Sequence, residues 1–269
     1  MRVLINEADS TFPDLLLKLG DGQLLSQNCE TDTISLSEFG NEVGNIDALI
    51  DNVFPNFSEN HLNPVWLTDR AILSALNETV TKINNKFSDR LSTPEITYIS
   101  INRMVNDGES VQFPVEFLNS IEMSGLPPHS LKLKIGMPVM LMRSLKPPEL
   151  INGTRCVVIS CYPNVAEVEI VTGTYKGQRH FIPRIPLEPS DTQLPFKFQR
   201  RQLPIQPCFA MTINKAQGQT LKSVGLDLRQ PVFNHGMLYV ALSRTGDKKN
   251  IYYLAPNGST RNVVYTEVL

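Results

Sequence analysis

Residues 209–220 read FAMTINKAQGQT, an apolar run that passes directly into polar side chains and a glycine. Phe209–Ile213 predicts a buried strand, because a short apolar run that ends at a turn signal is typical of one. Polar residues follow up to Gly218, so we expect a loop that leads into a helix near Lys215. The start of a helix offers unpaired N–H groups, and with the lysine charge it would suit a phosphate. An ordinary polar loop between a strand and a helix explains the same residues.

The second informative segment is HGMLYVALSR at residues 235–244, within a helix predicted over Asn234–Arg244. Strands predicted at Val224–Leu228 and Ile251–Leu254 flank it, so strands and helices alternate through this part of the chain. Arg244 has two interpretations. It is either a positive charge at the C-terminus of a helix or an arginine finger that stabilises charge on a transferred phosphate through two parallel hydrogen bonds.

The N-terminal part has the same mixture of apolar periodicities. Helical spacing runs from Phe12 to Leu19 and again over Ile46–Phe54. Val65–Leu67 predicts a strand, with Thr68 as the N-cap of a helix that follows. The buried face of that helix is predicted to carry the following residues: Ala71 or Ile72, Ala75 or Leu76, Val80, and Ile83 or Phe87. These elements predict an α/β fold with a mostly parallel sheet.

From residue 131 the sequence changes to short β-rich runs separated by Pro, Gly and Asn. The runs are Val139–Met142, Arg155–Ser160, Val165–Val171, Gln178–Ile185 and Phe196–Arg201. Short strands at this density predict a small antiparallel barrel. The simplest organisation is an α/β sheet that begins early, is interrupted by a β insertion and resumes after Pro207.

The charge of the chain is unevenly distributed. The 269 residues hold 25 Lys and Arg against 27 Asp and Glu. Residues 1–130 have 7 basic and 19 acidic side chains, residues 131–222 have 13 and 5, and residues 223–269 have 5 and 3. A basic segment of this kind is typical of proteins that bind a polyanion, although segment charges also cancel on folding.

Membrane, secretory and metal-binding signals are weak. No apolar run approaches the roughly 18 residues that cross a bilayer, and the start MRVLINEADS lacks the apolar core of a signal peptide. Cys29, Cys156, Cys161 and Cys208 are too scattered for a disulfide framework. Cys156 and Cys161, with His180 further on, fit no usual zinc module. We therefore expect an intracellular protein with no membrane partner and no metal site.

The segments FAMTINKAQGQTL and HGMLYVALSR, in this order and spacing, resemble the fifth and sixth motifs of superfamily 1B DNA helicases. The nearest resemblance is to the petite-integration-frequency helicases and their Helitron-transposon relatives, and WLTDRAIL, LNETVTKIN, LINGTR and RRQLPIQPCFAMT agree with it. It implies ATP-driven 5′→3′ movement along single-stranded DNA by two RecA-like domains, with ATP in the cleft between them. It also implies that the second of these domains carries an inserted SH3-like barrel.

On this resemblance the chain is the C-terminal part of such a helicase. Residues 1–130 would be the first part of the second RecA-like domain with a connecting segment. Residues 131–205 would be the barrel, and residues 206–269 would be the second part of the RecA-like domain, with the late motifs.

The resemblance also implies roles for single residues, given by motif position. Thr212, Asn214 and Lys215 match positions that bind the DNA backbone. Arg244 matches the catalytic arginine that reaches the γ-phosphate. The positions on the side of ATP are Arg2, Gln217, Gly218 and Gln219, of which the last three couple DNA to nucleotide.

Two family signatures do not occur in these 269 residues. A P-loop needs a Gly-Lys dipeptide and the acidic Mg²⁺ site an Asp-Glu dipeptide, and the sequence has neither. We therefore expect ATP and Mg²⁺ to bind only with a further N-terminal RecA-like ATPase domain. That domain and single-stranded DNA would be the partners of the chain. For the compartment, the nucleus is favoured over the mitochondrion. Met237 stands where the family usually has Gln, and Ala75 where it often has Pro. The alternative function is a non-catalytic single-stranded DNA-binding protein or a transposon-derived remnant.

Aromatic residues outside the motifs have two interpretations each. Trp66 could stack on a base, but its apolar neighbours favour the core. Three phenylalanines lie among basic residues of the predicted barrel: Phe181, Phe196 and Phe198 among Arg179, Arg184, Lys197, Arg200 and Arg201. Proteins that bind single strands combine these residue types, and ordinary alternation along strands produces the same mixture.

Overall fold

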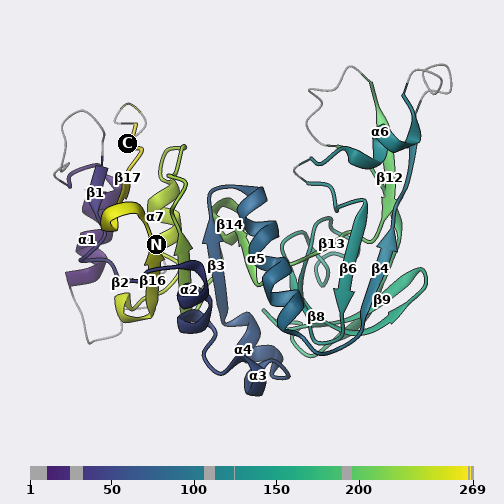
Figure 1. The fold of residues 1–269 in the computed structure, drawn as a ribbon, viewed down its shortest axis with the longest axis horizontal. Coiled ribbons are helices and arrows are strands. Elements are labelled where there is room, and N and C mark those ends of the chain that lie inside the picture. Colours follow the sequence, from purple (N-terminus) through teal and green to yellow (C-terminus); the bar gives the residue numbers. More distant parts are fainter. Residues whose placement is uncertain are drawn as a thin grey trace. The chain divides into compact units, whose positions relative to one another are not determined.

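The computed structural model describes residues 11–24, 33–105, 113–123, 125–189, 196–265 and 267 (Figure 1). Contacts divide the chain into two units. Unit 1 contains Met1–Asn85 and Phe209–Leu269, and unit 2 contains Lys86–Cys208. Unit 1 is therefore built from both ends of the chain, as expected for an α/β sheet that is interrupted and later resumed.

The core of unit 1 is a five-stranded sheet in the order β14-β3-β15-β16-β2, and all its pairings are parallel. Its strands are β14 (Ala210–Thr212), β3 (Arg70–Ser74), β15 (Ser223–Asp227), β16 (Ile251–Leu254) and β2 (Asn41–Glu42). β15 is buried along its whole length and β3 along all but its first residue. Continuous burial of this kind is typical of parallel strands covered on both faces.

Short helices pack around this sheet. α2 (Ile46–Val53) begins at Asn45, whose side chain accepts a hydrogen bond from Ala48 N at 2.8 Å. The helix lies so close to β15 that a Cβ at Gly225 would be 2.8 Å from Val53 Cγ2, so the position requires glycine. The remaining elements are α1 (Thr11–Gly20), α3 (Phe57–Asn60), α7 (Met237–Leu242), the 3-10 turns η2 (Ile213–Ala216), η3 (Lys248–Asn250) and η4 (Pro256–Gly258), and the antiparallel pair β1 (Thr33–Ser35) with β17 (Ser259–Arg261).

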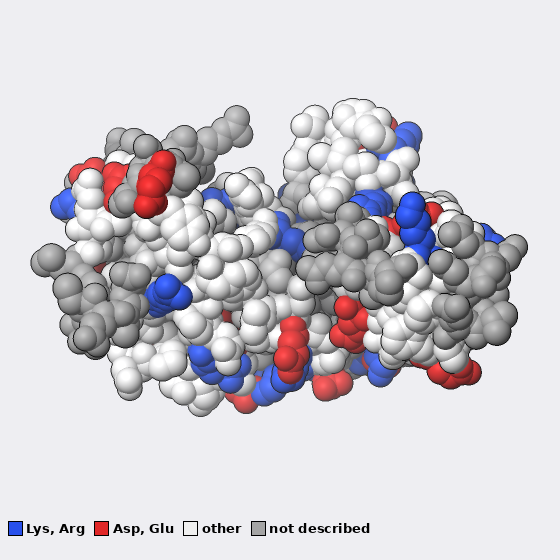
Figure 2. Space-filling model, turned by 90° about the horizontal axis from the view of Figure 1, so that it is seen from above, with Lys and Arg blue, Asp and Glu red and all other residues white. Residues whose placement is uncertain are grey.

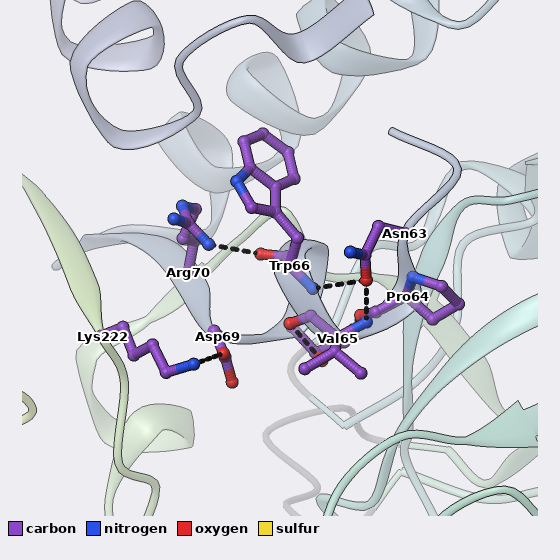
Figure 3. Close-up of polar contacts among 8 residues, drawn as sticks. Asn63, Pro64, Val65, Trp66, Asp69, Arg70 and Lys222 are labelled. Atoms are coloured by element: carbon purple, nitrogen blue, oxygen red, sulfur yellow. Dashed lines mark hydrogen bonds and ion pairs between the residues drawn. The ribbon is translucent and has the colours of Figure 1, made fainter. Parts of the chain in front are cut away.

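The strand predicted at Val65–Leu67 is wrong. These residues belong to α4 (Pro64–Thr68), at the foot of β3 in Figure 1. Asn63 Oδ1 accepts hydrogen bonds from the N–H groups of Val65 and Trp66, both at 3.1 Å (Figure 3). An Asn cap followed by Pro at the first helical position outweighs the β preference of Val-Trp-Leu.

The helix predicted after Thr68 begins later than expected. α5 (Asn77–Arg90) follows β3, so Ala71 and Ile72 lie on the strand and not on the helix. Val80, Ile83 and Phe87 are buried on α5, as predicted.

Trp66 is partly buried at the amino end of β3. Its ring contacts Phe54 edge-on, with centroids 5.8 Å apart, and the Arg70 guanidinium lies 4.6 Å from its centroid (Figure 3). Arg70 also donates to Trp66 O at 2.9 Å. Beside them Lys222 forms an ion pair with Asp69 at 2.6 Å, between the amino ends of two neighbouring parallel strands. These contacts favour the packing interpretation of Trp66.

Unit 2 consists of antiparallel strands. Its five-stranded sheet has the order β10-β9-β8-β7-β13, a second sheet has the order β11-β12-β5, and β4 pairs with β6. The bounds are β4 (Glu95–Ile99), β5 (Ile101–Met104), β6 (Ser130–Lys134), β7 (Pro138–Leu141), β8 (Arg155–Tyr162), β9 (Val165–Ile170), β10 (Arg179–Pro183), β11 (Ile185–Leu187), β12 (Phe198–Gln202) and β13 (Ile205–Pro207), with helix α6 (Val115–Ser120). The β insertion is present. Closure of these sheets into an SH3-like barrel remains a prediction, because no pairing in the described ranges joins β10 to β13.

Contacts place the boundaries of unit 2 at Lys86 and Cys208. β4 and β5 therefore group with the antiparallel strands, although they precede residue 131, where we predicted the barrel to begin. The division of the chain at residues 131 and 205 stays a prediction.

The aromatic and basic residues of unit 2 divide into buried and exposed members. Phe196, Phe198 and Arg200 are buried, while Phe181 is 61% exposed and Arg201 is exposed. The Arg200 guanidinium donates to Asn102 Oδ1 and to three main-chain carbonyls, at 2.9–3.1 Å. Alternation of buried and exposed positions over residues 196–201 therefore accounts for five of the eight residues. In the described part of the chain, no helix has the length and apolar character needed to span a bilayer.

Candidate functional site

The carboxyl edge of the parallel sheet in unit 1 carries most of the predicted site. Thr212 at the end of β14 pairs in register with Ser74 at the end of β3, which pairs with Asp227 at the end of β15. Ligands of open parallel sheets bind outside the carboxyl ends of the strands. Ser74 Oγ is buried and has no hydrogen-bond partner among the described residues.

The predicted DNA-backbone residues lie at the end of β14 and on the turn η2 that follows it. Ile213 and Ala216 of η2 are buried, which leaves Asn214 exposed and Thr212 and Lys215 partly exposed. We predicted a helix near Lys215 that would offer its N-terminus to a phosphate. That prediction is wrong, because η2 is a 3-10 turn of four residues with no side-chain cap. The turn therefore has no α-helical N-terminus, and its exposed polar side chains remain as candidates for a phosphate contact.

The turn is anchored from α5. Asn84 is buried, and its side-chain amide pairs with the main chain of Ala210. Nδ2 donates to Ala210 O at 3.0 Å, and Oδ1 accepts from Ala210 N at 2.8 Å. Since β14 is the last strand in the order of its sheet, Asn84 occupies hydrogen-bonding groups that would otherwise be free.

Arg244 connects the end of α7 to the same turn. Nη1 donates to Ala216 O at 3.2 Å and Gln219 O at 3.1 Å, and Nε donates to Val240 O at 2.7 Å. Nη2 donates to Ser243 Oγ at 2.7 Å. Burial lowers the pKa of the Arg244 guanidinium from its ordinary value. In this arrangement Arg244 satisfies carbonyls at the end of a helix, as one interpretation predicted, and it also holds the segment at residues 216–219.

The residues predicted on the side of ATP are only partly brought together. Gln217 and Gly218 are exposed beside Arg244, and Gly218 has a positive φ of 80°. Gln219 donates to Lys215 O at 3.1 Å, and its buried Oε1 accepts no hydrogen bond from any described residue. Arg2 lies outside the described residues. Met237 is buried on α7.

One charged pair at this edge was not predicted from the sequence. Asp227 is buried at the end of β15 and is bound by Arg229, at 2.9 and 2.6 Å. The available signal was an acidic residue at the end of the apolar run Val224–Leu228, because a carboxylate is rarely buried without a partner.

The described residues include no group of three or more His, Cys, Asp and Glu able to hold a metal ion. Burial raises the pKa of the Cys156 thiol to about 12, so this cysteine is a poor thiolate ligand at neutral pH.

The charge on one face of the molecule is mixed. On the face drawn in Figure 2, Lys and Arg lie scattered among Asp and Glu, and the described residues there form no continuous basic patch. On this face a polyanion would meet individual basic side chains.

Comparison with known proteins gives a consistent result. The family "DNA helicase Pif1, 2B domain" matches residues 116–161, within unit 2. The chain is 33% identical over 129 residues to the ATP-dependent DNA helicase PIF6 of Trypanosoma brucei brucei, covering 46% of this chain and 16% of that protein. It is 37% identical over 121 residues to human ATP-dependent DNA helicase PIF1, covering 42% and 18%.

A solved structure resembles the chain over more of its length. The crystal structure of a Pif1 helicase from Bacteroides, in complex with ADP-AlF3 and single-stranded DNA, matches with a TM-score of 0.59 at 20% identity. The match covers 91% of this chain and 49% of that one. The chain thus shares the fold of about half of that protein, and its sequence matches span less than a fifth of the two relatives.

Proposed function

We propose that this chain, which is similar in sequence to Pif1 helicases over part of their length, forms the DNA-binding second RecA-like part of a superfamily 1B ATP-dependent 5′→3′ DNA helicase. Thr212, Asn214 and Lys215 bind the backbone of single-stranded DNA. Residues 131–205, within unit 2, form the inserted SH3-like barrel. Arg244 is the catalytic residue that reaches the γ-phosphate of ATP, with Arg2, Gln217, Gly218 and Gln219 beside the nucleotide.

One observation supports this proposal most. Thr212 ends β14, and Asn214 and Lys215 lie on the turn η2 that follows it. Arg244 donates to Ala216 O in that turn and to Gln219 O just after it. Movement of the Arg244 guanidinium toward a phosphate would release two carbonyls next to the DNA-binding turn. DNA and nucleotide would then be coupled through a single side chain. A separate P-loop domain would hold ATP and Mg²⁺. Because the proposed substrate is DNA, we place the protein in the nucleus or mitochondrion.

A second candidate function is single-stranded DNA binding without catalysis. It is favoured by the four hydrogen bonds of Arg244, which use most of its donors within the chain. In that case the arginine stabilises the DNA-binding turn and never meets a nucleotide.

Both candidates predict salt-dependent binding of single-stranded DNA. The chain should bind a fluorescein-labelled oligothymidylate without sequence preference, and the affinity should fall steeply with salt as counterions are released. Lys215→Ala should lower the affinity and flatten the slope of log K against log salt by about one unit. Fluorescence anisotropy at several salt concentrations measures both quantities.

Lys222→Ala is the matched control for Lys215→Ala. It removes the same charge from the amino edge of the sheet, where Lys222 pairs with Asp69 (Figure 3). Its salt slope should equal that of the unmodified chain. An equal slope for Lys215→Ala would remove Lys215 from the DNA contact.

A further inference from the structure

The loop between β15 and α7, residues 228–236, begins at the same carboxyl edge as the DNA-binding turn. Thr212 and Asp227 are in register on β14 and β15, with β3 between them. Neighbouring strands lie about 4.8 Å apart, so the start of the loop is about 10 Å from Thr212. A bound strand of a few nucleotides reaches both places.

Asp227 fixes the first residue that this loop presents. The carboxylate is 1% exposed, Oδ1 accepts from Arg229 Nε at 2.9 Å and from its main-chain N at 3.3 Å, and Oδ2 accepts from Nη2 at 2.6 Å. A buried carboxylate needs such a partner. The two-point pairing through Nε and Nη2 also sets the plane of the guanidinium.

The other side of this guanidinium is available. The Arg229 side chain is 50% exposed, and its Nη1 makes no hydrogen bond to any residue that the structure describes. The hydrogen bond with Asp227 raises the pKa of Arg229, so the group keeps its charge. An oriented guanidinium with free N–H groups is suited to a phosphate oxygen.

The same loop also presents an aromatic ring. Phe233 is 51% exposed, and its exposed neighbours include Gln230 and Asn234. A single exposed phenylalanine is common on protein surfaces. Its position on one short loop with a fixed cation is more specific, because cations and exposed aromatic faces together bind single-stranded nucleic acid.

We propose that the β15–α7 loop is a second contact for single-stranded DNA, in which Arg229, held by Asp227, binds a phosphate and Phe233 stacks on a base. The proposal rests on the proposed function, because the same strand must also pass Thr212. Asp227 is a positioning residue in it, since its carboxylate acts only through Arg229.

The test uses the whole chain and two labelled strands of equal length, an oligothymidylate and an abasic strand with the same phosphates. Arg229→Gln should lower the affinity for both strands and flatten the salt slope by about one unit. Phe233→Ala should lower the affinity for oligothymidylate by about tenfold, since one stacked base contributes on the order of that factor. It should leave binding of the abasic strand unchanged.

Two controls remove a guanidinium and an exposed apolar side chain elsewhere in unit 1. Arg261→Gln changes an exposed arginine on β17, and Leu62→Ala removes an apolar side chain that is 73% exposed, between α3 and α4. Asp227→Asn is a sharper variant. It removes a negative charge, which by electrostatics alone should tighten DNA binding, whereas loss of the positioning contact should weaken it.

The results distinguish failure of the loop proposal from failure of the proposed function. Suppose the unmodified chain binds DNA and Lys215→Ala weakens it, but Arg229→Gln matches Arg261→Gln and Phe233→Ala matches Leu62→Ala. The loop is then no DNA contact, and the proposed function stands. Tighter binding by Asp227→Asn would overturn the positioning role. If the unmodified chain binds neither strand, both the function and the inference fail.

Discussion

Arg244→Lys should reduce DNA-stimulated ATP turnover by about 10³–10⁵ when this chain is joined to a P-loop-bearing RecA-like domain. An arginine that stabilises the transferred phosphate contributes a factor of that size. Lysine keeps the charge but loses the two parallel hydrogen bonds of the guanidinium. Steady-state turnover with saturating single-stranded DNA measures the effect.

The chain by itself should hydrolyse no ATP, since positioning of phosphates and Mg²⁺ supplies most of the catalysis in phosphoryl transfer.

The hydrogen bonds of Arg244 suggest an alternative role, in which the arginine only stabilises the structure around the turn. If Arg244 only holds residues 216–219 and the end of α7, lysine should lower the melting temperature and the DNA affinity, and turnover should fall no further than DNA occupancy does. The catalytic role instead predicts a turnover loss at saturating DNA that far exceeds any change in affinity. Near-normal turnover of Arg244→Lys would overturn the assignment of Arg244 as the arginine finger.

Arg200→Met should lower the free energy of unfolding of unit 2 by about 3–5 kcal/mol. Arg200 is fully buried and satisfies Asn102 Oδ1 and the carbonyls of Pro127, Leu118 and Ile121. Methionine keeps the apolar stem but removes the donor of the Pro127 and Ile121 carbonyls, at roughly 1–3 kcal/mol for each group that water does not reach. Asn102 Oδ1 and Leu118 O each keep one longer hydrogen bond, from Ser100 Oγ at 3.3 Å and from Asn102 Nδ2 at 3.5 Å. Urea unfolding followed by far-UV circular dichroism measures the change at constant slope.

The neighbouring Arg201→Met is the control for Arg200→Met. Arg201 is exposed, so its replacement should change stability by no more than about 0.5 kcal/mol. Trp66 is the single tryptophan and lies in unit 1, so its fluorescence follows that unit. In Arg200→Met the circular dichroism transition should therefore move to lower urea than the fluorescence transition. Equal midpoints for the two arginine variants would show that the buried contacts of Arg200 contribute little.

The sequence predicted the elements that strong local signals mark. Ile251–Leu254 is a strand over the predicted residues, and most of the β runs between Val139 and Arg201 are strands within a few residues of their predicted bounds. These runs are apolar and are bounded by Pro, Gly or Asn, so local propensity and burial agree. At Val65–Leu67 the local signals conflict, and the cap at Asn63 decides for a helix.

Contacts between distant residues could not be predicted from such patterns. Arg200 and Arg201 are neighbours of the same type, and only the fold distinguishes the buried from the exposed one. Motif position assigned Arg244 to the γ-phosphate, but it did not predict the hydrogen bonds to Ala216 and Gln219, which lie 28 and 25 residues away in the chain. Asp227 and Arg229 look like an ordinary solvated pair until β15 is known to be central in its sheet.

The hydrogen bonds of the Asn84 side chain mark the place where unit 2 is inserted into the chain. Asn84 and Ala210 are hydrogen-bonded at 2.8 and 3.0 Å, and they stand next to the two places where the chain leaves unit 1 and returns to it. The two ends of the 123-residue segment Lys86–Cys208 therefore lie close together beside β14. The parallel sheet of unit 1 contains no strand from this segment. Unit 2 is therefore inserted at a place where both of its ends lie together, which is where folded domains tolerate a long insertion.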